Sequence, residues 1–162
     1  MSKDGIMELE ILEDLIKSEY EDFTVGLTNG CFDIIHVGHT RYLTGAKKLA
    51  DILVVALNSD ESVARLKGAG RPIIPLEERM EIISTLEPVD FVTSFQEDTC
   101  RRTIELLRPD IYIKGGDYDR SNLPEWETVE RIGGKVELLP VTAGRSTSQI
   151  IDKIISSHHT SK

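Results

Sequence analysis

The chain has 162 residues, of which 28 are acidic and 19 basic, and its formal net charge is -9. This length fits one domain that buries roughly 68–70% of its unfolded surface, and the acidic balance disfavours a general nucleic-acid binder, which would carry a basic face. No apolar run is long enough to span a bilayer and the first residues are too polar for a secretory signal, so we expect a cytoplasmic protein without membrane or nucleic-acid partners.

The first predicted element is an amphipathic helix over Met7–Tyr20. We interpret residues 1–22 as an N-terminal helical extension that packs either on the domain or on a partner subunit. Five strand candidates follow, each succeeded by a helix-like stretch: Phe23–Thr28, Ile52–Leu57, Asp90–Thr93, Ile111–Lys114 and Lys135–Leu139. The alternation predicts an α/β fold, a Rossmann-like open parallel five-stranded sheet with the first strand central, as a single domain over residues 23–155. A short helix over Ile150–Ile155 and a flexible tail over 156–162 complete the prediction.

The turn His36-Val37-Gly38-His39 lies between the first strand and a helical pattern over Thr40–Leu49. Two histidines three residues apart can project toward one point, and Gly38 lets the backbone approach a ligand closely. The following helix adds free N–H groups and a positive dipole end. The turn therefore predicts a polyphosphate site at the carboxyl end of the first strand, although histidines beside a glycine also occur as plain turn or surface residues.

Other phosphate and metal signatures are absent from the sequence. It contains neither a GxGxxG fingerprint opening a helix nor a P-loop, so the predicted phosphate site is of the histidine kind. Cys31 and Cys100 lack the spacing of metal ligands. We therefore expect two reduced thiols and no metal held by protein ligands alone.

Four motifs carry a resemblance to a known superfamily. The run Asn29–His39 looks like the signature of the cytidylyltransferase-like nucleotidyltransferases, which share the His-x-Gly-His turn. Three further segments are similar to the adenylyltransferase domain of the ADP-heptose synthases: Leu66–Pro72 with Pro75–Met80, Lys114–Tyr118, and Gly144–Ile151. The resemblance covers nearly everything from Phe23 to Ile155, with the motifs in the order of the family.

The resemblance implies a set of functional residues. It implies catalytic roles for His36, His39 and Lys67, and contacts of the acceptor substrate with Asp33, Lys67 and Arg71. The implied nucleotide-binding residues are Cys31, Phe32, Gly38, Arg79, Gly116, Asp117, Gly144, Ser146, Thr147 and Ser148. The implied ligands are ATP with Mg²⁺ and a sugar 1-phosphate, and the implied assembly is a homo-oligomer, a dimer or higher.

Several of these residues also have ordinary structural explanations. The side chain of Cys31 can be a small apolar filler, and Asp33 can hydrogen-bond the turn as readily as a ligand. Arg79 can pair with a neighbouring glutamate on its helix. The hydroxyls of Ser146–Ser148 can cap the last helix, which is compatible with phosphate binding at the same helix start.

The expected reaction is transfer of AMP from ATP to D-glycero-D-manno-heptose 1-phosphate, giving ADP-heptose and pyrophosphate. Two alternatives stay open: a cytidylyltransferase for a small polyol phosphate such as glycerol 3-phosphate, and a nucleotide-binding module without turnover. The superfamily's cytidylyltransferases usually carry Arg-Thr-Glu-Gly where this chain has Val141–Gly144, which favours ATP over CTP. ADP-heptose synthases are often fused to a sugar kinase, and we expect that step on another polypeptide.

Overall fold

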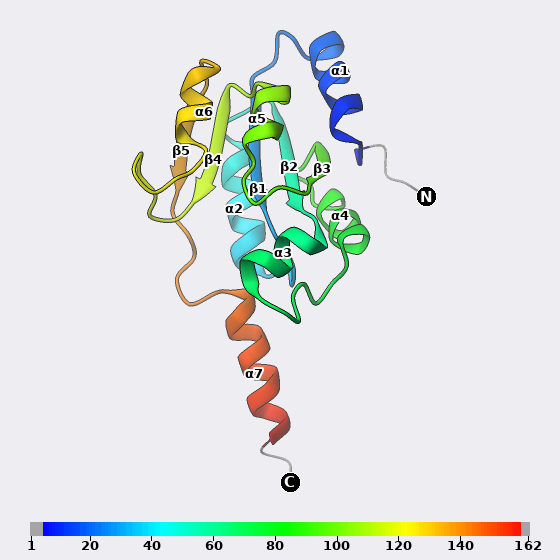
Figure 1. The fold of residues 1–162 in the computed structure, drawn as a ribbon, viewed down its shortest axis with the longest axis vertical. Helices are drawn as coiled ribbons and strands as arrows, with labels where there is room; N and C mark the ends of the chain where they lie inside the picture. Colours follow the sequence, from blue (N-terminus) through cyan, green and yellow to red (C-terminus); the bar gives the residue numbers. More distant parts are fainter. Residues whose placement is uncertain (1–4, 160–162) are drawn as a thin grey trace.

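The computed structural model describes residues 5–159 and contains one parallel sheet (Figure 1). Its strands are β1 (Val25–Gly30), β2 (Ile52–Asn58), β3 (Phe91–Phe95), β4 (Ile111–Gly115) and β5 (Lys135–Leu139). They lie in the order β3-β2-β1-β4-β5, so the prediction of five parallel strands with the first at the centre is confirmed. The chain reverses its direction of travel across the sheet between β1 and β4. This switch point is where ligands bind in open α/β sheets.

Helices cover both faces of the sheet. One face carries α1 (Leu9–Glu19), α5 (Arg101–Leu107) and α6 (Trp126–Arg131), and the other carries α2 (Val37–Lys47) and α4 (Leu76–Ser84). The short helix α3 (Asp60–Lys67) directly follows β2, and α7 (Thr147–His159) ends the described chain. The arrangement is the doubly wound architecture that alternating strands and helices dictate.

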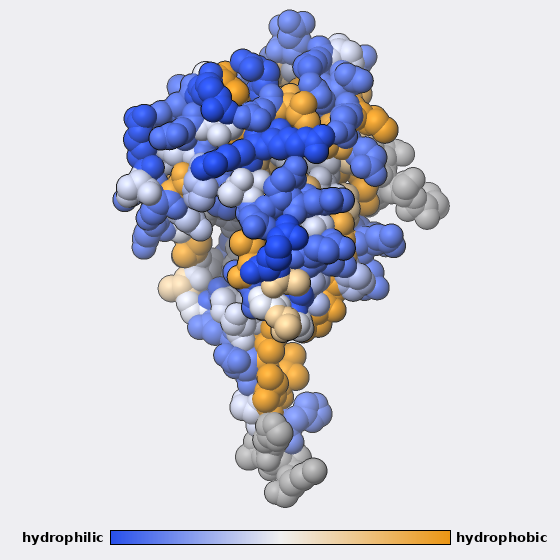
Figure 2. Space-filling view, in the orientation of Figure 1, coloured by the Kyte–Doolittle hydropathy of each residue, from blue (hydrophilic) through white to orange (hydrophobic). Residues whose placement is uncertain are grey.

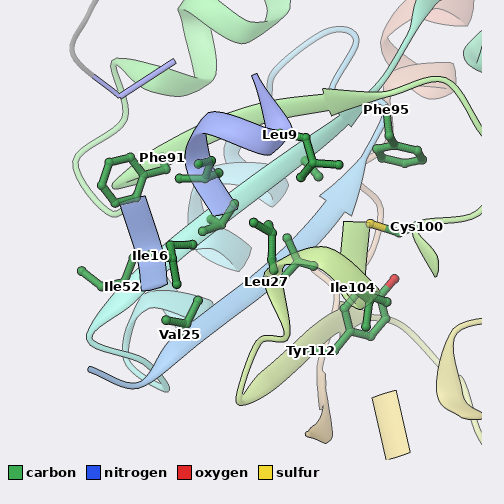
Figure 3. Close-up of a cluster of buried hydrophobic side chains, with 14 of the residues drawn as sticks. Leu9, Ile16, Val25, Leu27, Ile52, Phe91, Phe95, Cys100, Ile104 and Tyr112 are labelled. Atoms are coloured by element: carbon green, nitrogen blue, oxygen red, sulfur yellow. The ribbon is translucent and has the colours of Figure 1, made fainter. Parts of the chain in front are cut away.

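Strand β2 shows why the sheet is buried on both sides. Every residue from Ile52 to Asn58 is buried, because a parallel strand under two helix layers has no solvent face. Side chains alternate between faces, so Val54 belongs to the core beneath α1 and α5, whereas Val55 belongs to the core beneath α2 and α4. Figure 3 shows the first of these clusters, with Leu9 and Ile16 of α1 packed over the strands.

The predicted elements differ from the observed ones mainly at their ends. Helix α2 begins at Val37, three residues before the predicted start, because His36 caps it. Helix α7 is longer than the predicted Ile150–Ile155, since it starts at Thr147 and continues to His159. Within the tail predicted as flexible, residues 160–162 lie outside the described part of the chain.

The N-terminal segment is built into the domain. Leu12 of α1 is completely buried, and α1 packs against α5 and β3. Ahead of the helix, the Met7 N–H donates to the Val92 carbonyl at 3.0 Å, and the Val92 N–H donates to the Gly5 carbonyl at 2.8 Å. The segment therefore pairs with the outer edge of β3, which would otherwise expose unpaired backbone groups.

Helix α7 projects away from the sheet (Figure 1). Its side chains Ile154 and Ile155 are 54% and 51% exposed, and Figure 2 shows hydrophobic atoms gathered over this helix. Among the described residues, no helix combines the length and the apolar character that a membrane crossing requires.

Leu12→Ala tests whether α1 belongs to the core. The change removes a fully buried side chain, so we expect the free energy of unfolding in urea to fall by about 2–5 kcal/mol. The neighbouring Ile11→Ala is the matched control, because Ile11 is 60% exposed and its loss should change stability by less than about 0.5 kcal/mol. Equal effects of the two substitutions would contradict the observed packing.

Candidate functional site

A cleft of about 580 Å³ opens at the carboxyl ends of β1 and β4. This volume falls within the range of roughly 300–1,000 Å³ that is typical of small-molecule sites. Of the residues predicted for the site, these line the cleft: Cys31, Phe32, Asp33, His36, Gly38, His39, Lys67, Arg71, Ser146, Thr147 and Ser148. The structure thus brings together the histidine turn, the loop after α3 and the start of α7.

The two histidines of the turn lie against one another. Their ring centroids are 3.9 Å apart and the ring planes differ by 34°. The Nδ1 atom of His36 accepts the Gly38 N–H at 3.1 Å, and Nδ1 of His39 accepts the His36 N–H at 3.3 Å. Each histidine therefore satisfies a backbone donor at the first turn of α2, and this reciprocal cap fixes both rings.

These hydrogen bonds determine the chemical form of the rings. Burial, reinforced by the nearby His36, lowers the pKa of His39 to about 4. Burial and then Arg145 also lower the pKa of His36. Near pH 7 both rings are neutral, and because Nδ1 accepts in each, the proton resides on Nε2. The turn offers two fixed neutral N–H donors to the cleft.

Gly38 and Tyr42 hold the turn in place. A Cβ atom at Gly38 would lie 2.7 Å from Cε1 of His36, so only glycine leaves room for the ring. The Tyr42 hydroxyl on α2 donates to the Ile113 carbonyl at 2.9 Å and lies 2.7 Å from the Thr28 hydroxyl. These contacts tie α2 to both strands of the switch point.

Asp33 organises the loop that follows α3 and carries Arg71. Its buried carboxylate accepts the N–H groups of Ile73 and Ile74 at 2.9 Å and the Arg71 Nε at 2.7 Å. Burial acts to raise the pKa of Asp33, but these donors together hold it below its usual value. Of the two predicted roles, Asp33 therefore fills the structural one. Arg71 lines the cleft already paired, whereas Lys67 is exposed at its rim.

Arg79, which was predicted to contact the nucleotide, lies outside the lining of the cleft. Its side chain is completely buried and does not line the cleft. The guanidinium donates to the carbonyls of Ile74, Cys31 and Asn58 at 2.6–2.9 Å and to the Asp60 carboxylate at 2.7 Å. All its nitrogens are occupied, so Arg79 supports the cleft from beneath. It pairs with Asp60 of α3 and not with a glutamate on its own helix.

The start of α7 forms another wall. The Ser146 hydroxyl accepts the Gln149 N–H at 3.2 Å, which confirms the predicted cap, and the Thr147 hydroxyl donates to the Ile34 carbonyl at 3.2 Å. Gly144 lies in an adjoining depression instead of the cleft. Gly116 and Asp117 likewise do not line the cleft.

Several polar lining residues were not predicted as site residues from the sequence, among them Asn29, Tyr42, Tyr118 and Glu125. Glu125 is 5% exposed, although its chemical type and its place in a loop after Pro124 suggest solvent. Lys114 and Arg145 belong to two of the segments that carry the family resemblance, and both also line the cleft. No local pattern marks Glu125, because it reaches the cleft only through the packing of α5 and α6.

Comparison with known proteins identifies relatives of this chain. A family model described as cytidylyltransferase-like matches residues 27–160. The bifunctional protein HldE of Hahella chejuensis is 55% identical over 78% of the chain, and that of Citrifermentans bemidjiense is 49% identical over 97% of it. The chain spans only 27% and 32% of the lengths of these two proteins.

Two solved structures have similar folds. A lipopolysaccharide core biosynthesis protein from Thermoplasma volcanium superimposes with a TM-score of 0.61 at 31% identity, covering 74% of this chain and 97% of the other. A pantoate-beta-alanine ligase from Francisella tularensis, complexed with beta-gamma ATP and beta-alanine, gives a TM-score of 0.63 at 14% identity, covering 88% and 68%. The second likeness concerns the fold alone.

The low pKa of His39 predicts a pH-dependent stability. Between pH 6.5 and 4 the His39 ring binds a proton in the unfolded chain but stays neutral in the folded protein. The free energy of unfolding should therefore fall by about 1–3 kcal/mol as the pH falls through this window. His39→Asn removes the titrating ring while its Oδ1 can still accept the His36 N–H. Urea unfolding at pH 7 and pH 4.5 should therefore show a smaller loss in the variant. His158→Asn, on an exposed part of α7, should behave like the unchanged protein, and three identical pH profiles would contradict the burial of His39.

Proposed function

The chain belongs to the cytidylyltransferase-like family, and we propose that it transfers AMP from ATP to D-glycero-D-manno-heptose 1-phosphate, releasing pyrophosphate. The observation that carries the proposal is the pair of neutral, fixed Nε2–H donors on His36 and His39 beside the hydroxyls of Ser146 and Thr147. Donors fixed in this way need no reorganisation when charge develops on a phosphate.

In the proposed reaction an oxygen of the sugar phosphate attacks the α-phosphorus of ATP. The new P–O bond forms as the bond to the β-phosphate oxygen breaks in line, and pyrophosphate leaves with that electron pair. The attacking oxygen is already anionic, so no protein base is required. His36 and His39 donate to the oxygens of the transferring phosphate, and Lys67 holds the two anionic reactants together at the rim.

Residues at the start of α7 are placed to hold the leaving pyrophosphate. Ser146 and Thr147 lie at the N-terminal end of the 13-residue helix α7, where backbone N–H groups and the helix dipole favour anions. Arg145 lines the same wall and adds a positive charge. Its position next to His36 favours a role for Arg145 at the phosphates.

Mg²⁺ fits this cleft as a companion of ATP. Among the described residues there is no group of three or more histidine, cysteine, aspartate or glutamate side chains suited to a metal. Mg²⁺ commonly keeps its waters and binds through substrate phosphates, where it neutralises part of the triphosphate charge. The hydroxyls of Ser146 and Thr147 line the same cleft and could serve as neutral oxygen ligands.

The proposal that the acceptor is a heptose 1-phosphate rests on similarity to known proteins. The HldE proteins at 55% and 49% identity, the lipopolysaccharide core biosynthesis protein and the motifs similar to ADP-heptose synthases all support a heptose 1-phosphate, with the product used for lipopolysaccharide or a surface glycan. We do not favour the cytidylyltransferase alternative. We further propose that the enzyme works in the cytoplasm, where ATP is available.

Turnover with different nucleotides tests the proposal. With heptose 1-phosphate as the acceptor, pyrophosphate release should show a kcat/KM for ATP about 10-fold or more above that for CTP. The reason is that the chain lacks the arginine that cytidylyltransferases carry before Gly144. Comparable values would support the cytidylyltransferase alternative. A folded protein that binds ATP and releases no pyrophosphate with any sugar phosphate would support the non-catalytic one.

Two variants at His39 test the roles of its two ring nitrogens separately. His39→Asn keeps an acceptor near Nδ1 but nothing near Nε2, so we expect kcat to fall by about 10²–10³ with a nearly unchanged KM for ATP. His39→Gln places an amide N–H near the Nε2 position and should retain more of the turnover. The thermal melting point of each variant provides the control for folding. Full turnover in a folded His39→Asn protein would rule out the proposed donor.

We also propose that two copies associate through α7. A 13-residue helix is marginal alone in water, and the exposed Ile154 and Ile155 give it an apolar face suited to a second copy of itself. Light scattering after gel filtration should show a dimer or larger assembly, and the double change of these residues to serine should yield the monomer. The matched control is Ile73→Ser, at an exposed isoleucine outside α7. An unchanged molar mass in the α7 variant would contradict the proposal.

A further inference from the structure

The cleft has a second polar wall that the phosphate chemistry does not use. Lys114 at the end of β4 and Glu125 just before α6 both line it. They carry opposite charges, yet the described structure contains no ion pair between them. A ligand in the cleft therefore meets a cationic donor and an anionic acceptor in the same lining.

Glu125 is a buried carboxylate with spare bonding capacity. It is 5% exposed, and its single hydrogen bond in the described chain comes from the Cys100 N–H, 3.0 Å from Oε1. Within residues 5–159, the only fully buried side-chain oxygens without a partner are the hydroxyls of Thr93 and Thr103. The second oxygen of Glu125 is consequently not fully enclosed, and the residue lines the cleft. A buried charge in this state is costly until a donor reaches it.

Lys114 has unused donors in the same cleft. Its ammonium makes one long hydrogen bond, 3.4 Å to Oδ1 of Asn29, an oxygen that also accepts the Tyr112 hydroxyl at 2.5 Å. The ammonium also lies over the ring of Tyr118, 5.8 Å from its centroid. An ammonium has three N–H donors, so two make no hydrogen bond in the described chain. Burial lowers the pKa of Lys114, and the Glu125 carboxylate is the largest influence that opposes this shift.

A hydroxyl is the group that satisfies both walls, because it accepts from an ammonium and donates to a carboxylate. A phosphate would accept a hydrogen bond from Lys114, but the negative charge of Glu125 would repel it. We propose that Lys114 and Glu125 form a subsite that binds a sugar hydroxyl, an inference that rests on the function proposed above. Two sources present this chemistry, the acceptor sugar and the ribose of ATP.

The test compares Glu125→Gln with Glu127→Gln, a matched change at an exposed position on α6. The glutamine at 125 can still accept the Cys100 N–H, but it turns an amide donor toward the ligand. Calorimetry gives dissociation constants for ATP, 2′-deoxy-ATP, 3′-deoxy-ATP and, with saturating α,β-methylene-ATP, for heptose 1-phosphate. We expect Glu125→Gln to weaken one hydroxyl-bearing ligand by about 10-fold or more, and Glu127→Gln to leave all ligands within about two-fold.

The ligand that is affected identifies the source. The subsite binds the ribose if Glu125→Gln weakens the binding of ATP while one of the deoxy-ATP analogues binds the variant and the unchanged protein equally. The subsite binds the acceptor if the variant weakens the binding of heptose 1-phosphate and leaves that of ATP unchanged. Constants within about two-fold for every ligand overturn the proposal. If Glu125→Gln fails to fold, the same measurements on Lys114→Met test the proposal. Loss of the ammonium must weaken the binding of a hydroxyl-bearing ligand and leave the binding of its deoxy analogue unchanged. Pyrophosphate release by the unchanged protein tests the proposed function separately, because binding constants need no turnover.

Discussion

The buried guanidinium of Arg79 connects the three segments that form the floor of the cleft. It joins the carbonyl of Cys31 after β1, the carbonyl of Asn58 at the end of β2 and the carbonyl of Ile74 before α4, and it pairs with Asp60. A fully buried charge is tolerated only when its donors are satisfied, so each of these backbone groups is fixed by the same requirement. The ends of β1 and β2 are thereby locked to the loop that follows α3.

Asp33 extends this constraint toward the ligand. The carboxylate binds the backbone of Ile73 and Ile74 on one side of the loop and the Arg71 side chain within it. Gly68 and Gly70 adopt positive φ angles of 99° and 89°, which lets the loop bend between Lys67 and its anchor. The histidine turn on the other side is fixed by its own reciprocal cap. The site is therefore preorganised on both sides before a ligand arrives.

The sequence predicted most of the fold and the central part of the site. Strands such as β2 are continuous apolar runs, and the His36–His39 turn has a strong local pattern. The sequence did not predict the burial of Arg79, because nothing in its helical pattern shows that carbonyls from three distant segments converge there. The place of Glu125 in the cleft was not predicted for the same reason, because its burial depends on long-range packing of α5 and α6. Local patterns report local structure, whereas these two residues acquire their roles only in three dimensions.

The fate of the phosphates of ATP tests the central claim, that the fixed histidine donors act on the α-phosphate. ATP labelled with ³²P at the α- or the γ-position would be incubated with Mg²⁺ and heptose 1-phosphate, and the products separated. The account predicts that the α-label appears in a nucleotide sugar and the γ-label in pyrophosphate, with no label retained on the protein. A γ-label in the sugar, or in inorganic phosphate alone, would contradict it.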